Sequence, residues 1–157
     1  MASSNHQWQI NSKTSDQTEA LAEQLARNLK GREVIELVSD LGGGKTTFVR
    51  GLARGLGSTN TVNSPTFKIS NVYHSPALTI NHFDLYRLHE SGLISYELAE
   101  VMNDPNGVTL IEWAADVADI LPDERLTVHF EHTGEHSRHI TFHYPTALAY
   151  LMEGLTS

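Results

Sequence analysis

The residues best suited to chemistry lie in a short segment near the end of the first third of the chain. Three consecutive glycines end at Gly44 and precede Lys45, Thr46 and Thr47. Glycines let the backbone curl so that successive N–H groups point at one anion. A lysine at this position carries a positive charge to terminal phosphates, and the hydroxyl after it is placed to hold magnesium. The segment therefore predicts a phosphate-binding loop for a nucleoside triphosphate.

The elements on either side of this loop fit the same interpretation. Val34–Val38 has the apolar character of a short buried strand, and apolar residues recur at helical spacing after Lys45. The usual pattern places an earlier glycine where this chain has Ser39. A glycine-rich turn with an exposed lysine is the alternative, but such a turn does not need three glycines followed by Lys-Thr. The expected nucleotide-binding residues are Asp40, Leu41, Gly42, Gly43, Gly44, Lys45, Thr46 and Thr47.

Two acidic residues downstream are candidates for the hydrolytic machinery. Asp84 and Glu112 each follow an apolar strand pattern, and carboxylates at strand ends in α/β folds lie where ligands bind. If their strands flank the strand that enters the loop, either carboxylate would be held near magnesium, directly or through water. A surface residue or a helix cap is the alternative for each. Arg87 either neutralises phosphate charge or pairs with a carboxylate, and Trp113 lies near the nucleotide or in the core.

The segment around Pro65 contains two further hydroxyl side chains, Ser64 and Thr66. Pro65 biases Ser64 to an extended conformation. The two hydroxyls face a γ-phosphate or its magnesium, or they belong to a turn that bonds its own backbone. The sequence supports both interpretations equally.

Composition limits the class of protein. The chain has 157 residues, of which 39% are hydrophobic, and no cysteine. This favours one domain over residues 1–157, and it excludes disulfides, thiol catalysis and cysteine-ligated zinc. No apolar run approaches the roughly 20 residues of a membrane span, and the first residues lack the regions of a signal peptide, so a cytoplasmic location is expected. The net charge of −8 predicts poor binding of nucleic acid without a partner.

The apolar periodicity predicts strands alternating with helices, hence an α/β fold. The first helix is expected to start with Asp16 as its cap and to end near Gly31. The third is expected to turn Leu93, Ile94, Leu98 and Val101 inward. Histidines 129, 139 and 143 fall on the polar side of a predicted hairpin, which favours a solvated face over a metal site. The remaining expected elements are strands at 7–10, 67–73, 78–87, 108–111, 125–131 and 138–144, and helices at 45–56, 93–102, 114–121 and 146–155.

Taken together, these motifs resemble the bacterial TsaE family, formerly YjeE, the ATPase subunit of the system that makes threonylcarbamoyladenosine in tRNA. The order and spacing of the motifs fit nearly the whole chain to about Phe142. The stretches that carry the resemblance are residues 40–48 (DLGGGKTTF), 63–67 (NSPTF), 82–88 (HFDLYRL) and 111–113 (IEW).

The resemblance implies a P-loop NTPase-like three-layer sandwich with a mixed parallel and antiparallel sheet. It implies a magnesium-dependent ATPase that is weak alone and activated by the TsaB and TsaD subunits, which hold the tRNA. In this family the equivalents of Thr46 and Glu112 hold magnesium, that of Asp84 is important for hydrolysis, and residues 64–67 resemble a switch loop. Ser39 and Gly43 depart from the usual loop sequence, and the histidine-rich hairpin near the C-terminus is not a recognised family feature.

Two other functions compete with this one. A small-molecule P-loop kinase normally covers its phosphates with an arginine-rich lid, but after Arg87 only Arg125 and Arg138 remain, and neither lies in such a segment. A nucleotide-binding scaffold that does not hydrolyse ATP has no need for Asp84 and Glu112. A magnesium-dependent ATPase is therefore the favoured prediction.

Overall fold

A computed structural model describes residues 5–39, 44–62, 69–86 and 92–156 of the chain. Of the predicted site residues, Asp40, Leu41, Gly42, Gly43, Ser64, Thr66 and Arg87 lie outside the described residues. Within the described part, none of the helices is long and apolar enough to cross a lipid bilayer.

One seven-stranded sheet runs through the molecule in the order β1-β7-β6-β2-β5-β4-β3. Neighbouring strands are parallel in the middle, between β6, β2, β5 and β4, and antiparallel in the three outer pairs. The strands are β1 (Asn5–Ser12), β2 (Val34–Val38), β3 (Ser70–His74), β4 (Thr79–Asp84), β5 (Gly107–Glu112), β6 (Leu126–His132) and β7 (Arg138–Pro145). The mixed α/β architecture predicted from the sequence is thereby confirmed.

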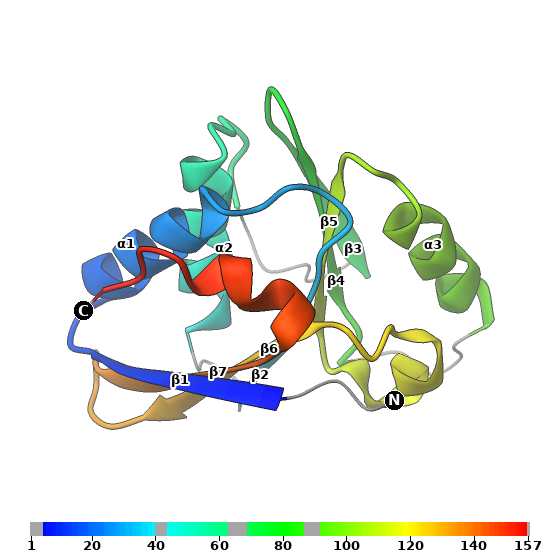
Figure 1. Ribbon diagram of the computed structural model, residues 1–157. Helices are drawn as coiled ribbons and strands as arrows, with labels where there is room; N and C mark the ends of the chain where they lie inside the picture. Colours follow the sequence, from blue (N-terminus) through cyan, green and yellow to red (C-terminus); the bar gives the residue numbers. More distant parts are fainter. Residues whose placement is uncertain (1–4, 40–43, 63–68, 87–91, 157) are drawn as a thin grey trace.

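Helices cover both faces of this sheet, as Figure 1 shows. One apolar core packs α1 (Ser15–Ala26), α2 (Lys45–Gly55) and the 3₁₀ helix η2 (Thr146–Met152) against one face. A second, smaller core packs α3 (Gly92–Met102) and the 3₁₀ helix η1 (Ala114–Ile120) against the other. Side chains alternate between the faces along each strand, so Leu110 belongs to the first core and Ile111 to the second.

Three details of the predicted elements are wrong. The cap of α1 is Thr14, whose hydroxyl accepts a hydrogen bond from the Gln17 N–H at 3.1 Å, and Asp16 lies in the first turn. The helix ends at Ala26 rather than near Gly31. Leu93 is 82% exposed, because α3 turns Ile94 and Leu98 toward the sheet. Leu93 and Ile94 lie about 100° apart around the helix, and docking of the helix decides which of them is buried.

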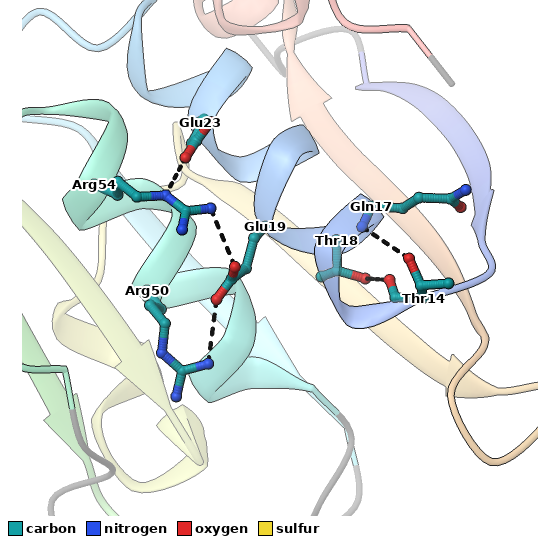
Figure 2. Close-up of polar contacts among 7 residues, drawn as sticks. All are labelled: Thr14, Gln17, Thr18, Glu19, Glu23, Arg50 and Arg54. Atoms are coloured by element: carbon teal, nitrogen blue, oxygen red, sulfur yellow. Dashed lines mark hydrogen bonds and ion pairs between the residues drawn. The ribbon is translucent and has the colours of Figure 1, made fainter.

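The helix that begins at Lys45 is held by very close packing against α1. Gly51 and Gly55 of α2 face Ala22 and Ala26 of α1, and a β-carbon on Gly51 would lie 2.7 Å from the Ala22 β-carbon. Ion pairs flank this contact. Arg50 and Arg54 both reach the carboxylate of Glu19, at 3.2 and 3.1 Å, and Arg54 also pairs with Glu23 (Figure 2). This contact sets where α2 starts relative to the sheet.

Candidate functional site

The described part of the predicted loop ends at a helix N-terminus that lacks a side-chain cap. Gly44 is the N-cap of α2 at φ +100°, a left-handed conformation that favours glycine, and no side chain of the described residues caps the first N–H groups of the helix. Such N–H groups, with the positive end of the helix dipole, suit an anionic group. Thr46 and Thr47 follow in the first turn and are half-buried. This geometry fits a phosphate.

Lys45 lies at the centre of the site and is only 6% exposed. Its ammonium nitrogen is 3.5 Å from Glu112 Oε1, 3.4 Å from the Ser39 carbonyl oxygen and 4.6 Å from the centre of the Trp113 ring. A buried ammonium is stable only when such partners compensate its lost hydration. Glu112, Ser39 and Trp113 supply this compensation for Lys45.

The two candidate carboxylates lie side by side at the carboxyl ends of neighbouring strands. Asp84 on β4 pairs in register with Glu112 on β5, and Glu112 pairs with Leu37 on β2. Residues in register on parallel strands point to the same face, here the face that α2 covers. Only β5 of these two strands flanks β2 directly, so Glu112 is the carboxylate beside the loop.

The environment of Asp84 differs from that of Glu112. Burial raises the pKa of the Asp84 carboxyl above its ordinary value, and the negative charge of Glu112 raises it further. The Tyr86 N–H donates to Asp84 Oδ1 at 3.1 Å and partly opposes this shift. Glu112 is 3% exposed and is compensated by Lys45. Two carboxylates in different environments are suited to different roles in one site.

Trp113 closes one side of the site in a strained conformation. Its φ of +58° is uncommon for a bulky side chain, and it directly follows Glu112. The indole ring packs against the half-exposed ring of Tyr86, with centroids 4.9 Å apart, and lies under Lys45. Trp113 therefore lies beside the loop lysine, and its expected place near the nucleotide stays a prediction.

Two residues at the site were not singled out from the sequence. His82 is fully buried, and its Nε2 lies 2.5 Å from Glu112 Oε2. Its two-residue separation from Asp84 on one strand was the available signal, since residues i and i+2 share a face. Arg138 of β7 packs beside the loop, where a β-carbon on Gly44 would lie 3.5 Å from Arg138 Nε. No local pattern predicts that approach, because 94 positions separate the two residues.

Arg138 also lines a small cavity next to the loop. Its Nη1 donates to the carbonyl oxygens of Gly134, Glu135 and Ser137 at 3.3, 3.3 and 2.8 Å, which fixes the guanidinium on the β6–β7 turn. The cavity measures about 40 Å³ and is lined by Ser15, Thr18, Gly44, Thr47, Glu135, His136 and Arg138. Thr18 reaches this cavity while its hydroxyl bonds Ser12 Oγ at 2.6 Å.

His129, His139 and His143 of the C-terminal hairpin alternate with core residues of β6 and β7 and lie on the face of the sheet away from α1 and α2. His129 and His143 pack edge to face with ring centroids 5.0 Å apart, and His139 bonds Asn11 at 2.7 Å. Burial lowers the pKa of His129, and the neighbouring His143 lowers it further. No cluster of three or more acidic or histidine ligands suited to a metal occurs among the residues described here.

Comparison with known proteins gives one consistent answer. The profile of the family described as "Threonylcarbamoyl adenosine biosynthesis protein TsaE" matches residues 12–140. A protein of Bacillus subtilis named tRNA threonylcarbamoyladenosine biosynthesis protein TsaE is 40% identical over 131 residues, which cover 81% of this chain and 79% of the relative. A protein of the same name from Treponema pallidum is 38% identical over 74% of this chain and 86% of its own length.

A solved structure agrees with these sequence matches. The crystal structure of YdiB from Bacillus subtilis superposes with a TM-score of 0.80 at 34% identity, covering 98% of this chain and 97% of YdiB. The likeness extends over the whole sheet and both helical layers.

Proposed function

The chain belongs to the TsaE family of tRNA threonylcarbamoyladenosine biosynthesis proteins, and from this premise we propose that it is a magnesium-dependent ATPase, slow alone and activated by partner subunits. The family is P-loop ATPase-like and acts in tRNA modification. We propose in addition the magnesium requirement, the roles of individual residues and the partner subunits.

The single observation that carries the proposal is the buried pair of Lys45 and Glu112. A lysine 6% exposed at an uncapped helix N-terminus, 3.5 Å from a carboxylate 3% exposed at the adjacent strand end, is costly as a purely structural device. The pair is well suited to bind phosphates and a cation, because Lys45 then pairs with the phosphates and Glu112 with the cation. Nucleotide contacts come from residues 40–47, with Lys45 at the terminal phosphates.

The oxygen donors at the site suit magnesium. Magnesium prefers hard oxygen ligands and usually takes one or two carboxylates in addition to phosphate oxygens. Glu112 and the Thr46 hydroxyl supply such donors, on the strand end and the helix start that flank Lys45. These two residues would hold magnesium, which would neutralise charge on the transferred phosphoryl group.

Asp84 is proposed to act in hydrolysis itself. Its raised pKa makes the carboxylate a better proton acceptor than an ordinary aspartate. It orients the attacking water and accepts a hydrogen bond from it, while Lys45 stabilises charge on the phosphate oxygens. Asp84 lies one strand further from the loop than Glu112.

The contacts of Lys45 are consistent with slow hydrolysis by the isolated chain. Its ammonium group already interacts with Glu112, Ser39 and Trp113, and a nucleotide must compete with these partners. A partner that arranges the segment around Ser64 and Thr66, together with Arg87 and Trp113, would favour the competent arrangement. We propose TsaB and TsaD for this role, with tRNA contacted only through them, since the net charge is −8.

The test measures phosphate release from ATP by the full chain, with and without TsaB and TsaD. Lys45→Ala is expected to abolish hydrolysis, whereas Lys30→Ala, at an exposed lysine over the Tyr150 ring, is the matched control and leaves it intact. Thr46→Ala and Glu112→Ala should raise the magnesium concentration needed, and Asp84→Asn should lower turnover while nucleotide binding persists.

Three outcomes contradict the proposal. They are wild-type turnover by a folded Lys45→Ala protein, fast hydrolysis that ignores the partner subunits, and tight tRNA binding by the isolated chain. A phosphorylated small-molecule product in place of free phosphate would instead support the kinase alternative.

A further inference from the structure

Glu112 uses its two carboxylate oxygens for two different partners. Oε1 lies 3.5 Å from Lys45 Nζ, beside the helix that begins at the loop. Oε2 lies 2.5 Å from His82 Nε2, on the neighbouring strand β4. A glutamate has three side-chain torsions and loses considerable rotamer freedom when it is ordered. A contact to one oxygen therefore determines where the other oxygen points.

His82 has few other reasons to be at this position. Its side chain is fully buried on β4, next to the edge strand β3, with the Tyr73 ring 6.1 Å away between centroids. Its Nδ1 is buried and has no hydrogen-bond partner among the described residues. Burying a polar ring with one nitrogen unsatisfied costs free energy that an apolar side chain of similar size avoids. The contact with Glu112 is the interaction that offsets this cost.

The chemistry of the contact shows which of the two groups, His82 or Glu112, donates the hydrogen. An ionised carboxylate only accepts, so His82 Nε2 is the donor and Glu112 Oε2 the acceptor. In the neutral imidazole with its hydrogen on Nε2, Nδ1 is an acceptor without a partner among the described residues rather than an unpaired N–H group. Hydrogen bonds to charged groups are among the stronger ones in proteins, so this bond restricts the Glu112 side chain effectively.

We propose that His82 is a positioning residue that holds Glu112 through Oε2 and thereby presents Oε1 to the cation of a bound magnesium nucleotide. The inference rests on the proposed function, in which Glu112 is a magnesium ligand. His82 itself touches neither nucleotide nor metal and acts only through Glu112. Partners of this kind, one step removed from the metal, set the orientation of the ligand.

The experiment measures nucleotide binding rather than turnover. Calorimetry uses the non-hydrolysable analogue adenylyl imidodiphosphate over a range of magnesium concentrations. It gives the affinity for the analogue without magnesium and, separately, the magnesium concentration at which the effect of the cation on binding is half complete, the half-saturation point. Electron paramagnetic resonance of Mn²⁺ with the same analogue reports the cation directly. His82→Leu removes the donor at similar volume, and we expect the half-saturation point for either cation to rise roughly tenfold, with magnesium-free affinity within about twofold of wild type.

Two conservative variants keep the test valid if His82→Leu does not fold. Glutamine places an amide N–H near the position of Nε2, whereas asparagine is too short to reach Glu112. His82→Gln should keep the magnesium half-saturation point near that of wild type. His82→Asn should raise it as His82→Leu does. Thr109→Val is the control for disturbing a buried polar group on β5, since Thr109 is 1% exposed and faces the opposite side of the sheet from Glu112.

The outcomes separate this inference from the function on which it rests. If Glu112→Gln raises the half-saturation point while both His82→Leu and His82→Asn match wild type, the positioning role is wrong and the metal assignment stands. Equal shifts in His82→Gln and His82→Asn would also overturn it, because packing would then be the cause. If wild-type binding ignores magnesium, or Glu112→Gln changes nothing, the metal assignment fails and this inference fails with it.

Discussion

The close contact between α1 and α2 makes Gly51 a sensitive position for the fold. A β-carbon at Gly51 would lie 2.4 Å from the Glu19 carbonyl oxygen, 2.9 Å from the Glu19 Cα and 2.7 Å from the Ala22 β-carbon. Two of these atoms belong to the backbone of α1 and cannot rotate away. Gly51→Ala therefore forces the two helices apart by about 1 Å, because an ordinary carbon contact needs about 3.5 Å.

The magnitude follows from two opposing effects. Overpacking of this kind costs about 1–3 kcal/mol, and a clash with backbone belongs at the upper end of that range. Alanine returns up to about 1 kcal/mol relative to glycine through its better helix propensity. The net loss of unfolding free energy is about 2 kcal/mol, which lowers Tm by about 4–8 °C for a chain of this size.

The assay is thermal unfolding by circular dichroism, with urea unfolding for the free energy. Gly92→Ala is the control, because Gly92 begins α3 and a β-carbon added there would meet no described atom within 4 Å. It should change stability by no more than about 0.5 kcal/mol. An unchanged or higher Tm for Gly51→Ala would refute the reasoning, since it would mean that α1 and α2 do not approach as closely as the structure has them.

Three other predictions concern separate parts of the molecule. Tyr150→Phe should lower the free energy of unfolding by about 1–2 kcal/mol, measured in urea, because it removes the 2.6 Å hydrogen bond to the buried Glu33 carboxylate. His129→Thr should reduce the loss of unfolding free energy on acidification. The pKa of His129 is lowered in the folded protein by burial and by His143. The stability that depends on neutral His129 is therefore complete above the unfolded-state pKa of about 6.5 and is lost as pH falls through the folded-state pKa. Thermal unfolding at pH 7.5 and pH 5 should show the variant losing less than wild type, and an equal loss would contradict the assignment. Trp113→Phe should remove most of the fluorescence change on nucleotide binding, and a retained signal would place the reporter elsewhere.

Much of the fold was predictable because its signals are local. The run at residues 34–38 is the strand β2, and the hairpin β6–β7 was expected from alternating polarity. The start of α2 at Lys45 also follows from glycine chemistry. Capping was less predictable, because Thr14 and Asp16 both have side chains that can cap a helix, and the geometry of the chain entering α1 selected Thr14.

The sequence by itself determined which chemical groups the site contains: a glycine loop, Lys45 with its hydroxyls, and a carboxylate at each of two strand ends. Only the tertiary structure decided how they meet. Strand order placed Glu112 beside β2 and Asp84 one strand further, and parallel register turned both to the face of α2. The same packing brought His82 to Glu112 and Arg138 to Gly44. Side-chain periodicity is a property of neighbours along the chain, whereas these contacts depend on strand register and helix docking, which are set by the packing of the whole core.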